Sequence, residues 1–72
     1  MTEQKTEISI RVRQIDEDTY YASSAQLSGL HVESETIEDV FEEARILAMD
    51  LISLDETSPY FDKKISFDLE VV

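Results

Sequence analysis

The sequence predicts an α+β domain of β-β-β-α-β order, in which one helix packs on one face of a four-stranded sheet. Residues 36–54 carry apolar side chains at three- and four-residue steps, which is typical of an amphipathic helix. Residues 6–15 and 64–72 instead alternate apolar and polar side chains, as half-buried strands do. The length predicts a single domain over residues 1–72, in which residues 1–5 are expected to fray.

The first two strands are expected to form a hairpin. Residues 6–15 place three apolar side chains on one face, Ile8, Ile10 and Val12. The acidic run 16–18 supplies a polar turn, because Asp side chains bond to their own backbone. Residues 20–24 return as the second strand, and Tyr20 and Ala22 are expected to point inward.

A turn and a short third strand precede the helix. Gly29, the only glycine, is expected to supply a turn with positive φ, and residues 31–33 follow as a strand. Thr36 is the predicted N-cap of the helix, with Asp39 three residues on as a shortened capping box. Pro59 marks the loop after the helix. The apolar stripe of the helix comprises Ile37, Val40, Phe41, Ala44, Leu47, Ala48 and Leu51.

Charge pairing predicts the order of the strands. A strand reached through a helix normally lies parallel to an earlier strand, by a right-handed crossover. If the last strand lies beside the first, Arg11 and Arg13 face the acids Asp68 and Glu70. Opposite charges on neighbouring strands stabilise by roughly 0.2–1 kcal/mol each. The predicted sheet order is therefore 3-2-1-4, and the last strand should bury three inner side chains, Ile65, Phe67 and Leu69.

The net charge of −11 comes from seventeen acidic and six basic residues. Clustered Lys and Arg residues hold nucleic acids, so no direct nucleic-acid contact is expected. A basic protein partner is favoured electrostatically, although acidic charge also serves solubility alone. The chain has no signal-peptide pattern and no apolar run of about 20 residues, so a cytoplasmic protein without membrane contact is expected.

No catalytic, metal or cofactor site is expected. The acidic run 16–18 lacks the central Gly and the distal Glu of a calcium loop. The first strand has no carboxylate at its centre, where an acid-dependent hydrolase would need one. His31, the only histidine, has Ser28 and Ser34 nearby in sequence but no clear nucleophile–base partner. It is expected at the solvent edge of a short strand, and the chain is predicted to be non-enzymatic.

Three short motifs occur in an order that resembles the HicB-like antitoxin domain. They are YYASS at 20–24, LSGL at 27–30 and TIEDV at 36–40. They are similar to the family's aromatic strand, its Leu-Pro-Gly-Leu turn and its helix start, and the resemblance covers about residues 8–54. Ala25 and Ser28 replace family prolines. The C-terminal DNA-binding segment of full HicB antitoxins is missing from this sequence, so the resemblance is to the stand-alone HicB-like branch, which has no established activity.

The resemblance implies a partial RNase H-like fold without the nuclease carboxylates, and a dimer or higher homo-oligomer. It also implies that the chain masks a small basic HicA-like toxin, which cuts mRNA. The acids that such a partner would meet are Glu33, Glu35, Glu38, Asp39, Glu42 and Glu43. Tyr60 and Phe61 are expected to anchor a contact, either within the protomer or with another chain. The alternative function is a homo-oligomeric structural or regulatory module without a toxin partner.

Overall fold

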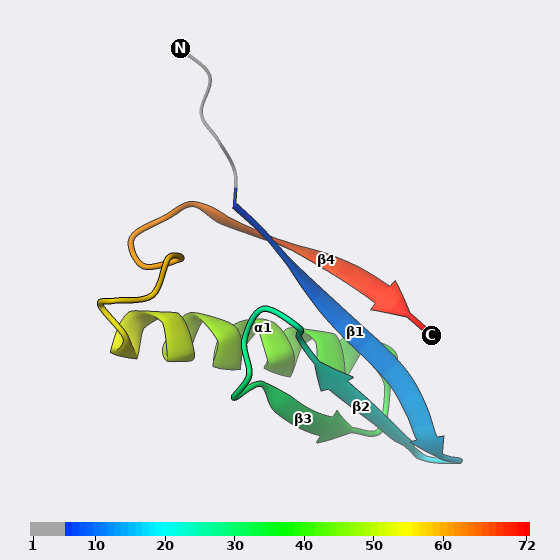
Figure 1. Ribbon diagram of the computed structural model, residues 1–72. Helices are drawn as coiled ribbons and strands as arrows, with labels where there is room; N and C mark the ends of the chain where they lie inside the picture. The colour runs from blue at the N-terminus through cyan, green and yellow to red at the C-terminus, as the bar shows by residue number, and fades with distance from the viewer. Residues whose placement is uncertain (1–5) are drawn as a thin grey trace.

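The computed structural model describes residues 6–72, and the expected fraying of residues 1–5 lies outside that range. The elements are β1 (Thr6–Asp16), β2 (Thr19–Ser23), β3 (His31–Ser34), α1 (Ile37–Leu54) and β4 (Ile65–Val71). The strands form one sheet in the order β3-β2-β1-β4, and α1 lies across one face of it (Figure 1). β4 runs parallel to β1, and the other pairs are antiparallel. The predicted α+β fold and strand order are confirmed.

Local signals set the ends of α1. The Asp39 N–H donates to the Thr36 side-chain oxygen at 3.1 Å, so Thr36 is the predicted N-cap. Glu38 and Asp39 occupy the first turn, where the positive end of the helix dipole favours acids. The helix ends at Leu54, and the Asp55 N–H then donates to the Ile52 carbonyl at 3.2 Å.

The core lies between α1 and the sheet. Nine apolar residues of the described range are buried, namely Ile8, Ile10, Val12, Ala22, Leu30, Val40, Ala44, Ala48 and Ile52. Tyr20 packs against this core, so the inward direction predicted for Tyr20 and Ala22 is confirmed. The buried line of α1 continues through Ile52, which the predicted stripe omitted, while Leu47 and Leu51 are only half-buried.

The second half of β4 is more exposed than predicted. Ile65 and Phe67 pack against the core, but Leu69 is 40% exposed and Val71 is 55% exposed. The packing contacts of α1 are chiefly with β1, β2 and β3, so the helix does not cover this part of β4. The predicted burial of Leu69 is therefore wrong. Alternation gives the side of the sheet that a residue faces, and it does not say whether a helix reaches it.

The turn at Gly29 is built without a positive φ, so that expectation is also wrong. The Leu30 N–H donates to the Leu27 carbonyl at 3.1 Å and closes the turn. A Cβ atom at Gly29 would lie 3.7 Å from the methyl groups of Leu51, which is ordinary contact. Within the described range, the non-glycine residue with positive φ is Asp62, at 59°.

One side chain extends the hydrogen bonding of β1 beyond the end of β2. Oε1 of Gln26 accepts from the Ser9 N–H at 2.8 Å, and its Nε2 donates to the Glu7 carbonyl at 2.8 Å. The pairing with β2 reaches only as far as Arg11. The Gln26 amide thus takes the place of a neighbouring strand along the first residues of β1.

Asp55 organises the loop that follows α1. Its Oδ1 accepts from the Thr57 hydroxyl at 2.6 Å and from the Thr57 N–H at 3.0 Å. These two bonds, the hydroxyl first, stabilise the carboxylate and lower the pKa of Asp55.

Ile10 and Leu69 are partners in the β1–β4 register and test how unevenly the helix covers the sheet. Ile10→Ala should lower the free energy of unfolding by about 2–5 kcal/mol, because Ile10 is fully buried. Leu69→Ala should cost less than half as much, since Leu69 is already partly in water. Urea denaturation measures both values, and equal losses would contradict the described packing.

Thr57→Val should raise the pKa of the Asp55 carboxyl toward the usual value of about 3.9. A carboxyl whose pKa is lower in the folded state stabilises the fold above its unfolded pKa. That contribution is lost as the pH falls through the folded pKa. The free energies of unfolding of the wild-type protein and of Thr57→Val should therefore converge at acid pH. NMR titration of the carboxyl carbon measures the shift, with Ser58→Ala as the control. An unchanged Asp55 titration in Thr57→Val would refute this role of Thr57.

Candidate protein-binding surface

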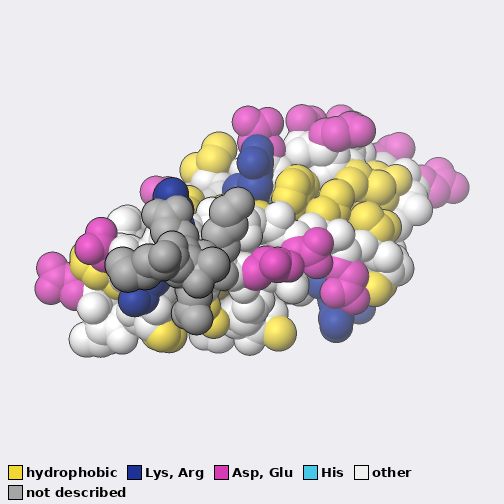
Figure 2. Space-filling model, turned by 90° about the horizontal axis from the view of Figure 1, so that it is seen from above, with side chains coloured by type: hydrophobic (Ala, Val, Ile, Leu, Met, Phe, Trp, Pro, Cys, Tyr) yellow, Lys and Arg dark blue, Asp and Glu magenta, His cyan; other side chains and the backbone are white. Residues whose placement is uncertain are grey.

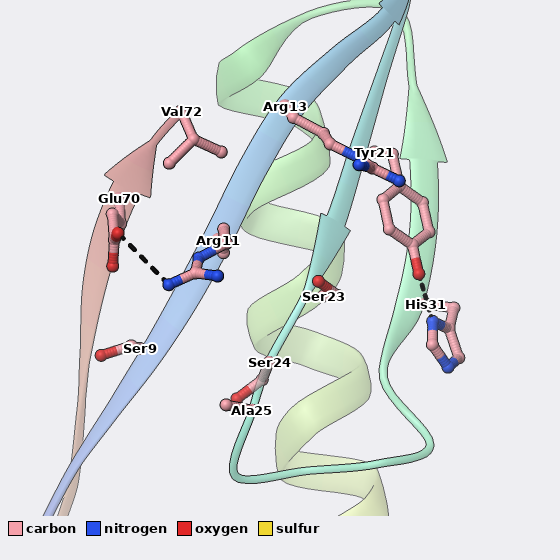
Figure 3. A pocket seen from close by; sticks show the side chains of 10 residues that line it. All are labelled: Ser9, Arg11, Arg13, Tyr21, Ser23, Ser24, Ala25, His31, Glu70 and Val72. Atoms are coloured by element: carbon pink, nitrogen blue, oxygen red, sulfur yellow. Dashed lines mark hydrogen bonds and ion pairs between the residues drawn. The ribbon is translucent and has the colours of Figure 1, made fainter.

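The sheet face opposite α1 is polar and carries a shallow depression (Figure 3). The depression is lined by Ser9, Arg11, Arg13, Tyr21, Ser23, Ser24, Ala25, His31, Glu70 and Val72. These residues come from all four strands and the segments beside them. Most are exposed or half-buried, so the depression is an open surface and not an enclosed pocket.

Both arginines on this face have partners. Arg11 Nη2 lies 3.5 Å from Glu70 Oε1, as the charge pairing predicted. The guanidinium of Arg13 instead lies over the Tyr21 ring, 5.6 Å from its centroid. The parallel register with β4 ends one residue before Arg13, so no acid of β4 lies opposite it. The predicted pairing of Arg13 with Asp68 or Glu70 is therefore wrong.

His31 is exposed, and two hydrogen bonds hold it in place. Nε2 lies 3.1 Å from the Ser28 carbonyl, which can only accept, so Nε2 carries a hydrogen. In the neutral ring, Nδ1 then accepts from the Tyr21 hydroxyl. The two rings also stack, with centroids 5.9 Å apart. Ser28 meets the ring through its main-chain oxygen and not its hydroxyl, so this contact is structural.

The acidic hairpin turn has a structural role. Asp16 ends β1, and its Oδ1 accepts from the Glu17 N–H at 2.6 Å. Within residues 6–72, no group of three or more His, Asp or Glu side chains is arranged to hold a metal ion.

The six acids predicted to meet a partner are all exposed, but they occupy two surfaces. Glu33 lies on β3 opposite Tyr21, on the open side of the sheet. The other five lie just before α1 or along its first half: Glu35, Glu38, Asp39, Glu42 and Glu43. Glu35 and Glu38 line one small depression at the start of the helix. The structure therefore groups these five and separates Glu33 from them.

Four of the acids form the acidic face of α1, defined here as Glu38, Asp39, Glu42 and Glu43. Glu38 and Glu42 are four residues apart, as are Asp39 and Glu43, so each pair lies on one side of the helix. Like charges at this spacing destabilise a helix by roughly 0.2–0.5 kcal/mol per pair. The helix dipole offsets this for the two acids of the first turn only. A bound cation would relieve the remaining repulsion.

The sequence interpretation missed an apolar strip between α1 and β4, defined here as Phe41, Met49, Leu69 and Val71. The last three are exposed, whereas Phe41 is half-buried and the Arg45 guanidinium lies over its ring, 5.3 Å from the centroid. Met49 is 45% exposed, and it lies with Phe61 in a depression beside the segment that leads into β4. Leu51, on the opposite flank of α1, lies with Gly29 at another depression. Phe41 and Met49 are eight residues apart, so they share the flank nearer β4.

Figure 2 looks onto the molecule from the side where β4 lies in Figure 1. Hydrophobic side chains gather there, and acidic side chains lie on both sides of them. The strip could have been expected from the sequence, which predicts one helix against four strands. A helix is about 10 Å wide, while four strands about 4.8 Å apart span roughly 14 Å between the outer two. One helix therefore leaves an edge of such a sheet uncovered.

Tyr60 and Phe61 lie half-buried in the loop between α1 and β4. Tyr60 packs against the core of its own protomer, and its N–H donates to the Ser58 hydroxyl at 3.2 Å. Phe61 lies near Met49, at the end of the apolar strip. The two aromatic residues thus have different surroundings, and Phe61 is the one that lies beside an exposed surface.

Comparisons with known proteins add no relative to this picture. The described residues contain no helix that has both the length and the apolar character of a membrane span. No protein-family model, no curated protein and no solved structure matches the chain.

Proposed function

We propose that this chain is a non-enzymatic binding protein that captures a small basic protein, in the manner of a HicB-like antitoxin. The observation that carries the proposal is the acidic face of α1. It presents four exposed carboxylates on one rigid element of a chain whose net charge is −11. The motif order in residues 20–40 supplies the kind of partner, a small basic HicA-like protein.

The electrostatics favour a basic protein as the partner. Exposed acids on a rigid helix attract a basic surface and speed its association more than they raise raw affinity. Exposed charges are screened over about 10 Å at 0.1 M salt, so the complex should weaken as salt rises. The arginines of the open sheet face support no direct nucleic-acid contact, because Arg11 pairs with Glu70 and Arg13 stacks on Tyr21.

A second candidate function is a homo-oligomeric module without a toxin partner. The observation in its favour is the apolar strip, which a second copy would remove from water. A chain of this size buries little surface by itself, so association would add stability. Sedimentation decides the matter, since a clean monomer at high concentration counts against this candidate.

Removing the charges of the acidic face should weaken capture of the basic partner. The variant combines Glu38→Gln, Asp39→Asn, Glu42→Gln and Glu43→Gln. Each exposed ion pair is worth about 0.2–1 kcal/mol, so the affinity should fall roughly tenfold or more. The partner is first recovered from the native host at low salt and identified by mass, and its affinity is then measured by calorimetry.

A charge-matched control removes four acids elsewhere, by Asp16→Asn, Glu17→Gln, Asp18→Asn and Glu56→Gln. It changes the net charge equally, so it should retain most of the affinity. An equal loss in both variants would show that only net charge matters. Recovery of no basic partner at low salt would count against the proposed function itself.

A further inference from the structure

β4 forms a long, unbroken edge of the sheet. It pairs with β1 without interruption from Ile65 to Val71, and no described strand pairs with its other side. Natural edge strands are protected by short length, charged side chains, Pro, a bulge or a covering element. β4 is seven residues long, contains no Pro and no bulge, and carries two charges on its open side, Asp68 and Glu70, whereas β3 at the other edge has four residues. β4 is therefore the edge at which another strand can add.

The two sides of β4 differ in chemistry. Phe67, Leu69 and Val71 face the side of α1, and the latter two are substantially exposed. The open side carries Asp68 and Glu70, of which Glu70 pairs with Arg11. A strand that pairs with this edge would place one row of side chains against the apolar strip and the other row beside Asp68 and the Arg11–Glu70 pair. The complementary strand thus alternates apolar and basic residues.

We propose that the free edge of β4 binds an extended segment of alternating apolar and basic residues as a fifth strand. Main-chain hydrogen bonds to β4 supply affinity, and the two rows of side chains supply specificity. Identification of the proposed basic partner as the source of this segment rests on the proposed function. Acidic side chains lie on both sides of the hydrophobic ones in Figure 2, so basic residues beside the segment are attracted from both sides.

A second copy of this chain fits the edge less well. In the antiparallel register that pairs all seven residues, Asp68 lies opposite Asp68 of the copy, and Glu70 lies opposite Ser66. Like charges directly opposite each other destabilise a strand pair. A basic segment instead places a Lys or Arg opposite Asp68. Charge complementarity therefore favours the basic segment.

Synthetic peptides test the site directly. The probe is a capped seven-residue peptide of alternating Val and Lys, titrated into the ¹⁵N-labelled protein. Shifts should be largest for the amides of β4, and their hydrogen exchange should slow. A Val–Glu peptide, and a Val–Lys peptide whose amides facing β4 are N-methylated, should bind at least tenfold more weakly. Equal binding of all three peptides would overturn the proposal.

Two variants locate the site on the chain. Leu69→Lys places a charge on the apolar side of the edge and should weaken Val–Lys binding at least tenfold. Ile46→Lys is the matched control, because Ile46 is 59% exposed and lies on the outer face of α1. Asp68→Lys should reverse the preference between the Val–Lys and Val–Glu peptides. No effect of Leu69→Lys or Asp68→Lys would place the binding elsewhere and overturn the proposal.

Three further outcomes distinguish a failure of the proposed β4 site from a failure of the proposed function. Peptide binding at β4 without a basic partner in the host supports the edge site and counts against the proposed function. Capture of a basic partner that is unaffected by Leu69→Lys supports the proposed function and overturns the edge as its site. Slow, concentration-dependent exchange of the β4 amides without peptide would assign the edge to a second copy, and it would overturn the proposal too.

Discussion

The structure depends on the packing of one narrow helix line against the central strand. Val40, Ala44, Ala48 and Ile52 form that line, and it buries the apolar side chains of β1. Two alanines in the line allow α1 to lie close to the sheet, which favours dense packing over wide coverage. Because a single helix is narrower than four strands, the sheet cannot be covered evenly. The incomplete burial of β4 follows from this geometry.

The uneven coverage determines where the surface features lie. The outer side of α1 needs no apolar residue for packing, and its first half carries the acidic face. On the open side of the sheet, Arg11, Arg13 and His31 are engaged with neighbouring side chains or main chain. The apolar strip beside β4 lies between these two polar surfaces, and the Arg45 guanidinium lies over its Phe41 ring. The two proposals together make the acidic face and the strip parts of one binding surface, suited to a partner that is both basic and partly apolar.

Much of the fold could be predicted because local signals and long-range pairing agreed. The alternation of β1 and β4, the Thr36 cap and the Arg11–Glu70 pair all pointed to the observed topology. The wrong predictions concern residues whose environment depends on the lengths and widths of neighbouring elements. The exposure of Leu69 depends on the reach of α1, and the partner of Arg13 depends on where β4 ends. The Gly29 backbone was misjudged because a turn can close without a left-handed residue.

The candidate surface was predicted only in part. Composition identified the acids, and helical spacing gathered four of them on α1, but the position of Glu33 required the sheet register. The apolar strip could have been inferred from the strand order and the width of a helix. The resemblance to HicB-like antitoxins remains a prediction from short motifs, and the identity of a basic partner rests on it.

Hydrogen exchange of the free protein at low concentration tests most directly whether α1 leaves the β4 edge open. Amides of β4 that bond to β1 should exchange slowly, and the alternate amides, which point away from β1, should exchange rapidly. Uniformly slow exchange along β4 in the monomer would mean that the edge is covered, and it would contradict this account of the surface.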